Sequence, residues 1–121
     1  MSKSILIVDD SEIIRRAVRH FLETETSFQV CGEAVDGLDA LEKVRGLSPD
    51  LVILDLAMPR MSGFQTASQL RAKMFNAPII LYTVHAGVIK PEQAQAAGVN
   101  AVVAKDDFDG LRTHIETLLT A

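Results

Sequence analysis

Charged and hydroxyl-bearing side chains follow four short apolar runs of the sequence, each at the point where a strand would end. They are Asp9 and Asp10 after residues 5–8, Asp55 after residues 51–54, Thr83 after residues 79–82 and Lys105 after residues 100–104. In an open parallel sheet the carboxyl ends of the strands meet at one edge, and ligands bind in the crevice beyond that edge. We therefore expect these five side chains to converge on one crevice.

Taken singly, each of these side chains has an ordinary structural role open to it. Asp10 and Thr83 could cap helices, and Asp55 could satisfy the amides of a turn. Lys105 could be a solvated loop residue. Together they fit such roles poorly, because three converging carboxylates repel one another and raise one another's pKa unless a cation intervenes. The combination therefore predicts a metal site.

The ligand atoms that this group offers are oxygens, which suit Mg²⁺, an ion that takes one or two carboxylates, keeps several waters and accepts phosphate oxygens. Zinc is disfavoured, since His20, His85 and His114 lack the spacing of metal ligands. A carboxylate beside a divalent cation, with an ammonium and a hydroxyl group aimed at the same space, can form an aspartyl phosphate. The predicted chemistry is phosphoryl transfer onto Asp55.

The sequence around residues 51–54 predicts the strand and the helix that position Asp55. This apolar run lies between a Ser-Pro-Asp turn and Pro59, as in a parallel strand buried on both faces. Pro59 cannot continue a ladder, so the chain leaves the sheet just beyond Asp55. Ser62 and Gln65 form a capping-box pattern, which predicts that a helix begins there.

The rest of the chain repeats the order of strand and helix. A weaker strand is expected at residues 28–34, at the sheet edge, and further helices at residues 11–22, 38–46 and 90–98 and from 108 onward. In the first of these helices Ile13 belongs to the expected buried stripe, whereas Arg15 is expected to point outward. Five strands alternating with five helices predict a doubly wound α/β domain with a parallel sheet.

Composition fits a single domain over residues 1–121, with 48% hydrophobic and 23% charged residues. A net charge of −4 argues against direct nucleic-acid contact by this domain. Cys31 is the one cysteine, which suits a reducing compartment. The first apolar run is too short for a signal peptide or a membrane span, so we expect a cytoplasmic protein without membrane attachment.

The chain resembles the response-regulator receiver domains, the CheY-like family of two-component signal transduction, over essentially its whole length. The resemblance rests on Asp9, Asp10, Thr83, Lys105 and the D-x-x-M-P-x-M-x-G stretch that begins at Asp55. It implies a flavodoxin-like, five-stranded parallel sheet in the order 2-1-3-4-5 with five helices, an order for which CheY is itself a standard example.

The resemblance also implies a function, a phosphorelay switch in which Asp55 accepts a phosphoryl group from a sensor histidine kinase or a phosphotransfer protein. Mg²⁺ would be held by Asp10, Asp55 and the Ala57 carbonyl, and by Asp9 through water. Lys105 and Thr83 would hold the phosphoryl oxygens.

In such a switch the domain is not an enzyme beyond its own phosphorylation and dephosphorylation. The expected partner or output-domain surface is the face made by residues 90–98, 100–104 and 108 onward, on a monomer or a phosphorylation-dependent dimer. Two positions depart from the family pattern. Val102 stands where an aromatic residue is frequent, and Asp106 stands where proline is common.

Three other functions share parts of this pattern. A phosphorylation-independent docking module would keep the same residues without using them. A small Mg²⁺-dependent phosphohydrolase would need an acid two residues after its nucleophile, where this chain has Ala57. A flavin or nucleotide carrier would need a hydroxyl- or glycine-rich loop after the first strand, where Asp9-Asp10-Ser11-Glu12 would repel phosphate.

Overall fold

The computed structural model describes residues 2–120, so Met1 and Ala121 of the expected domain lie outside the described residues. The strands are β1 (Ser4–Val8), β2 (Gln29–Ala34), β3 (Leu51–Leu54), β4 (Ile79–Thr83) and β5 (Ala101–Ala104). The helices are α1 (Glu12–Glu25), α2 (Gly37–Leu47), α3 (Gly63–Ala72), α4 (Pro91–Ala97) and α5 (Phe108–Thr120), with a short 3₁₀ helix, η1 (Ala86–Val88), before α4.

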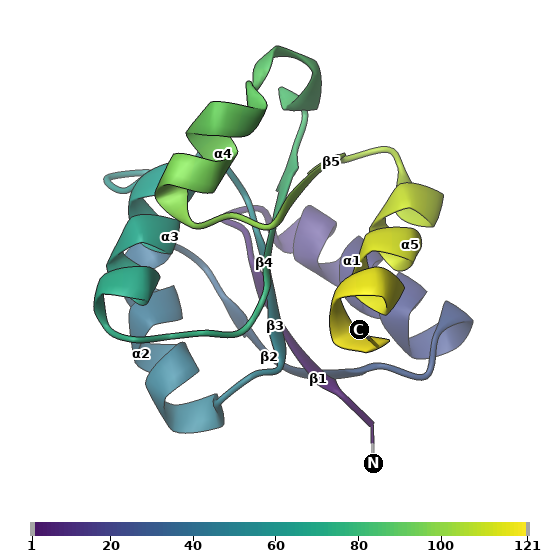
Figure 1. Cartoon of the computed structure of the whole chain (residues 1–121). Helices are drawn as coiled ribbons and strands as arrows, with labels where there is room; N and C mark the ends of the chain where they lie inside the picture. The colour runs from purple at the N-terminus through teal and green to yellow at the C-terminus, as the bar shows by residue number, and fades with distance from the viewer. Residues whose placement is uncertain (1, 121) are drawn as a thin grey trace.

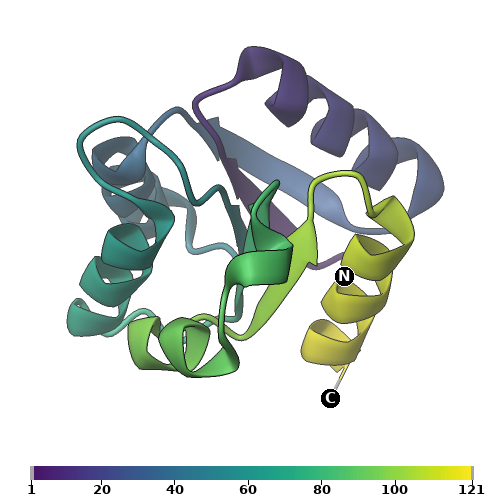
Figure 2. The same ribbon diagram turned by 90° about the horizontal axis from the view of Figure 1, so that it is seen from above.

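The strands form one parallel sheet in the order β2-β1-β3-β4-β5, and helices cover both of its faces. Helices α1 and α5 lie on one face, and α2, α3 and α4 lie on the other (Figure 1). The view from above separates the same two layers (Figure 2). The predicted doubly wound fold, its strand order and the edge position of β2 are therefore confirmed. Among residues 2–120, no helix has the length and apolar character needed to cross a bilayer.

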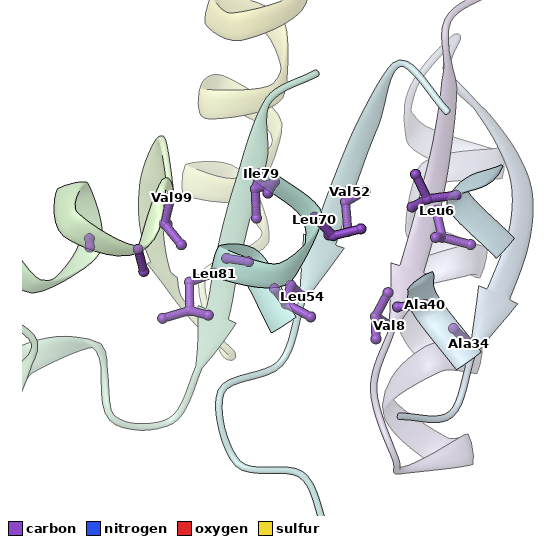
Figure 3. Close-up of a cluster of buried hydrophobic side chains, with 14 residues drawn as sticks. Leu6, Val8, Ala34, Ala40, Val52, Leu54, Leu70, Ile79, Leu81 and Val99 are labelled. Atoms are coloured by element: carbon purple, nitrogen blue, oxygen red, sulfur yellow. The ribbon is translucent and has the colours of Figure 1, made fainter. Parts of the chain in front are cut away.

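Each central strand divides its side chains between two hydrophobic cores. In β1, Leu6 and Val8 belong to the core under α2, α3 and α4 (Figure 3), whereas Ile5 and Ile7 belong to the core under α1 and α5. These four side chains are at most 1% exposed. Burial on both faces explains why the strands are continuous apolar runs rather than alternating ones.

The pairing of β1 with β3 brings two acids to the same edge of the sheet. Val8 lies opposite Leu54 in the register, and the Asp55 N–H donates to the Val8 carbonyl at 2.8 Å. The ladder thus continues for one hydrogen bond beyond the end of β3. Asp9 and Asp55 consequently leave the sheet side by side.

The helix that follows β3 begins where the sequence predicts. The Ser62 side chain accepts a hydrogen bond from the Gln65 N–H at 3.2 Å, and the Gln65 side chain accepts one from the Ser62 N–H at 2.9 Å. The capping box is therefore confirmed. It fixes the end of the loop that starts at Asp55.

Two expectations for α1 are wrong. Ile13 was expected in the buried stripe, but it is 79% exposed, because the buried stripe of α1 lies over Val18, Phe21 and Leu22. Arg15 was expected to point outward, but its side chain is only 12% exposed. Its guanidinium has partners on β2 and on the loop after β1, which a single helical pattern does not reveal.

Candidate functional site

Three carboxylates meet at the carboxyl edge of the sheet. Asp9, Asp10 and Asp55 each offer an oxygen that lies within 4.8 Å of the others, and within residues 2–120 they form the one group of three or more acidic, His or Cys side chains that could hold a metal ion. Asp9 and Asp55 are 2% and 4% exposed, whereas Asp10 is exposed. The cluster therefore has a buried floor and one carboxylate open to solvent.

Lys105 is the cation of this cluster. Its Nζ lies 2.9 Å from Asp9 Oδ2 and 3.0 Å from Asp55 Oδ1, and its side chain is 15% exposed. The Lys105 N–H donates to the Thr83 carbonyl at 3.1 Å, so β4 anchors the residue just beyond the end of β5. One ammonium group is thus shared between two buried carboxylates.

The charges in the cluster are incompletely balanced. Burial, and after it repulsion from Asp9, raises the pKa of Asp55 above its usual range in spite of the contact with Lys105. Burial alone would lower the pKa of Lys105, but its hydrogen bonds to Asp9 and Asp55 raise it. Lys105 faces two buried anions, while Asp55 has only a share of one cation. The cluster retains an excess of negative charge.

This donor set fits Mg²⁺. It offers hard oxygen ligands only, it includes a solvent-facing carboxylate through which an ion can enter, and its excess negative charge is what a divalent cation would neutralise. Ala57 lies in the exposed loop two residues beyond Asp55, at the same edge of the sheet.

The loop that carries Asp55 and Ala57 is closed tightly against the start of α3. The Gly63 N–H donates to the Leu56 carbonyl at 2.7 Å, and a Cβ atom at Gly63 would collide with the Asp55 carbonyl oxygen. Only glycine allows this approach. The backbone after Asp55 is therefore held in place by close packing rather than by further strand pairing.

Thr83 ends β4 at the same edge of the sheet. It is 1% exposed, and its hydroxyl accepts a hydrogen bond from the His85 N–H at 3.1 Å. This bond ties the hydroxyl to the loop that leads into η1. His85 is exposed, as are His20 and His114, and none of the three belongs to the metal-binding group.

Arg15 is a residue of the site that the sequence did not reveal. Its Nη1 donates to the Asp9 carbonyl at 2.7 Å, and its Nε bonds Glu33 of β2 at 2.9 Å. Arg19 bonds the other oxygen of Glu33 at 2.7 Å. Arg15 thus links the Asp9 backbone to Glu33 in the edge strand β2, and Arg19 holds the second oxygen of the same carboxylate. The one feature of the sequence that could have indicated this contact is Glu33, a single acid in the weak strand that follows the arginine-rich helix.

Replacing Glu33 by glutamine is expected to lower the free energy of unfolding by about 1 kcal/mol at neutral pH, because two charge-assisted hydrogen bonds in a partly exposed setting are weakened. Burial opposes it, but the hydrogen bonds from Arg19 and Arg15 lower the pKa of Glu33 below 4.5, its ordinary value. Because the pKa of Glu33 is lower in the folded state, its ionised side chain contributes its full stabilisation above the ordinary pKa. This contribution to the free energy of unfolding is lost as the pH falls through the lowered pKa.

Urea unfolding of both proteins between pH 7 and pH 3 measures this difference. The gap in stability should close in acid. A gap of the same size at both ends of the range would show that the charge of Glu33 is not its source.

Comparison with known proteins identifies the family. Residues 5–116 match the family described as "Response regulator receiver domain". The chain is 35% identical over 105 residues to the chemotaxis protein CheY of Halobacterium salinarum, covering 87% of this chain and 86% of that protein. It is 38% identical over 103 residues to a protein-glutamate methylesterase/protein-glutamine glutaminase of Nocardioides sp., covering 84% of this chain but 28% of that protein.

The fold of this chain is also similar to that of a solved response regulator. The response regulator TrrA from Thermotoga maritima, in complex with Mg²⁺-BeF, superposes with a TM-score of 0.86 at 35% identity, covering 97% of this chain and 99% of that one. The chain thus spans nearly all of some relatives and less than a third of others. With a family match over most of its length, a shared fold and an acidic cluster at the strand ends, this chain belongs to the response regulator receiver domain family.

Proposed function

We propose that residues 1–121 form a phosphorylation-operated switch of a two-component phosphorelay, with Asp55 as the residue that accepts the phosphoryl group. The observation that carries this proposal is a buried carboxylate, Asp55, held against Lys105 in an acidic cluster that fits Mg²⁺. The donor would be the phosphohistidine of a sensor histidine kinase or of a phosphotransfer protein. Support from relatives comes from TrrA, which was solved with Mg²⁺-BeF.

In the proposed reaction an Asp55 carboxylate oxygen attacks phosphorus in line with the bond to the donor. The new O–P bond forms as the donor's N–P bond breaks, and the histidine nitrogen keeps the electron pair of that bond and takes up a proton. Lys105 turns from the carboxylate oxygen toward a phosphoryl oxygen, and the Thr83 hydroxyl donates to another. Both groups stabilise charge at the place where it accumulates.

The metal would be held by Asp10, Asp55 and the Ala57 carbonyl, with Asp9 acting through water. Bound there, Mg²⁺ would neutralise charge on the incoming phosphoryl oxygens. Asp9 keeps its contact with Lys105 in this arrangement, which leaves the lysine anchored when its second contact moves. The Asp9 side chain is held by Lys105, and the Asp9 carbonyl is held by Arg15. Asp9 would therefore keep its place while Lys105 moves toward the phosphoryl group.

The output of the switch would be altered binding of a downstream protein or of an output domain through the face formed by α4, β5 and α5. A monomer, or a dimer that forms on phosphorylation, would serve this output in the cytoplasm, without direct nucleic-acid contact by this domain and without membrane attachment. No turnover beyond the domain's own phosphorylation and dephosphorylation is part of the proposal.

The proposal is tested by incubating the purified chain with Mg²⁺ and acetyl phosphate, whose acyl phosphate replaces the histidine donor. Intact mass should increase by one phosphoryl group, and excess EDTA should prevent the increase. Amide NMR shifts should change at the sheet edge and across α4, β5 and α5. No mass increase with either acetyl phosphate or a phosphorylated histidine donor would leave the phosphorylation-independent docking module as the better explanation.

Magnesium alone is expected to stabilise the domain, because it relieves the repulsion between Asp9, Asp10 and Asp55. At a concentration one hundred times its dissociation constant the gain is about 2.7 kcal/mol. Thermal melts in EDTA and in millimolar MgCl₂ measure it. Asp10→Asn should remove most of the gain, whereas Asp109→Asn, which changes an exposed acid in the first turn of α5, should keep it. Equal gains in both variants would contradict the metal assignment.

A further inference from the structure

Tyr82 is the largest fully buried side chain of the sheet that carries a polar group. It precedes Thr83 in β4, is 2% exposed and packs in the core under α1 and α5 with Val103 and Leu111. Its hydroxyl donates a hydrogen bond to the backbone carbonyl of Lys105, with 2.5 Å between the two oxygens. A buried tyrosine needs such a partner, and the partner here is the first residue after β5.

Lys105 is therefore held at both of its backbone polar groups by consecutive residues of β4. The Lys105 N–H donates to the Thr83 carbonyl at 3.1 Å, and the Lys105 carbonyl accepts from Tyr82. Lys105 and Asp106 form a turn, and the side chains of Asp106 and Asp107 are exposed. The two hydrogen bonds thus fix the peptide with which that turn begins.

The position of this peptide governs the position of the ammonium group. A lysine side chain is a flexible four-carbon stem, so the position of its ammonium group depends on its backbone and on its partners. Here Nζ lies 2.9 Å from Asp9 and 3.0 Å from Asp55 at the same time. A small shift of the Lys105 backbone would change both distances.

The Tyr82 hydroxyl keeps its proton under all ordinary conditions. Burial, with the nearby charges of Asp106, Asp107 and Asp9, raises the pKa of Tyr82 to about 12. The hydroxyl is consequently a donor to the Lys105 carbonyl at neutral pH.

We propose that Tyr82 is a positioning residue for the phosphoryl-transfer site: its hydroxyl fixes the Lys105 backbone and thereby aims the Lys105 ammonium at the oxygen of Asp55. This inference rests on the proposed function of Asp55 as phosphoacceptor. Tyr82 touches neither the carboxylates nor the phosphoryl group and acts through Lys105.

The test is Tyr82→Phe, which removes the hydroxyl and keeps the ring that fills the core. The rate of phosphorylation by acetyl phosphate at saturating Mg²⁺ should fall by about tenfold, the effect of one lost hydrogen bond on a barrier. The dissociation constant of beryllofluoride should rise by a similar factor. That of Mg²⁺ should not rise, because Lys105 is a cation that shares Asp9 and Asp55 with the ion and does not hold it.

The matched control is Thr66→Val, which also removes a fully buried hydroxyl but one that bonds the Ser62 carbonyl in α3. It should lose stability without a change in rate. An unchanged rate in Tyr82→Phe, or an equal fall in the control, would overturn the positioning role. So would a parallel loss of Mg²⁺ and beryllofluoride affinity, which indicates general damage to the site.

A second measurement separates this inference from the proposed function. NMR relaxation of the Lys105 ε-methylene group, in the unphosphorylated domain, should show an ordered side chain in the wild type and a mobile one in Tyr82→Phe. If the wild type takes up no phosphoryl group but the ordering differs as expected, the phosphoacceptor proposal fails and the positioning role stands. Equal ordering in both proteins overturns the positioning role itself.

Discussion

Asp55→Asn is expected to abolish phosphorylation and, in the absence of metal, to make the domain more stable. The amide cannot act as the attacking carboxylate, so acetyl phosphate and Mg²⁺ should add no phosphoryl group. The gain in stability comes from removing one of two buried like charges. We expect about 1 kcal/mol, because relief from repulsion by Asp9 exceeds the loss of one charged contact with Lys105.

The pH dependence of this gain identifies its source. Burial and the charge of Asp9 raise the pKa of Asp55, and an acid with a raised folded-state pKa loses stability as the pH rises through that pKa. The stability gap between Asp55→Asn and the wild type should therefore open with rising pH and vanish in acid, below the ordinary pKa of aspartate. Urea unfolding in EDTA measures both proteins.

The control for this experiment is Asp109→Asn, which neutralises an exposed acid outside the cluster and should gain no stability over the wild type as the pH rises. If Asp55→Asn were less stable than the wild type at neutral pH without metal, the buried cluster would not be under charge strain. Repulsion between the buried carboxylates would then not be the driving force for Mg²⁺ binding.

Lys105→Ala is expected to have the second large effect, on stability as well as on phosphorylation. It leaves Asp9 and Asp55 buried without their shared cation. Removing one partner of a buried ion pair costs about 3 kcal/mol, the lower end of the usual range, because one carboxylate can take up a proton in response. Denaturant unfolding in EDTA measures the loss.

Magnesium distinguishes the two roles of Lys105. Saturating Mg²⁺ should restore much of the stability of Lys105→Ala, since the ion supplies positive charge to the same carboxylates. Phosphorylation should stay at least about a hundredfold slow, because the phosphoryl oxygen that the Lys105 ammonium would meet has lost its donor. Lys105→Arg keeps the charge and should keep the stability while phosphorylation remains impaired. Full phosphorylation of Lys105→Ala in Mg²⁺ would exclude a role for the lysine in the transfer.

The fold followed from the sequence because its signals are local. Four apolar residues ending at Asp55, Pro59 four residues later and the Ser62–Gln65 capping box mark a buried strand, its end and the next helix without knowledge of any partner. The convergence of Asp9, Asp10, Asp55 and Lys105 followed from the rule that parallel strands end at one edge.

What could not be predicted depends on partners distant in sequence. Arg15 looked like a solvated helix residue because its acceptors, Glu33 and the Asp9 carbonyl, become its neighbours only when β2 packs beside β1. Ile13 fits the helical spacing but lies outside the face that the sheet covers. Tyr82 read as one more apolar residue of its strand, since the acceptor of its hydroxyl follows 23 residues later.

The central claim is that Asp55 carries the phosphoryl group, and locating the modified residue tests it most directly. Treating the chain with acetyl phosphate and Mg²⁺, and then with borohydride, reduces an aspartyl phosphate to homoserine, which tandem mass spectrometry can place in the sequence. We predict homoserine at position 55 in the wild type and none in Asp55→Asn. Homoserine at Asp9 or Asp10 instead, or at no position after a measured mass increase, would contradict the account.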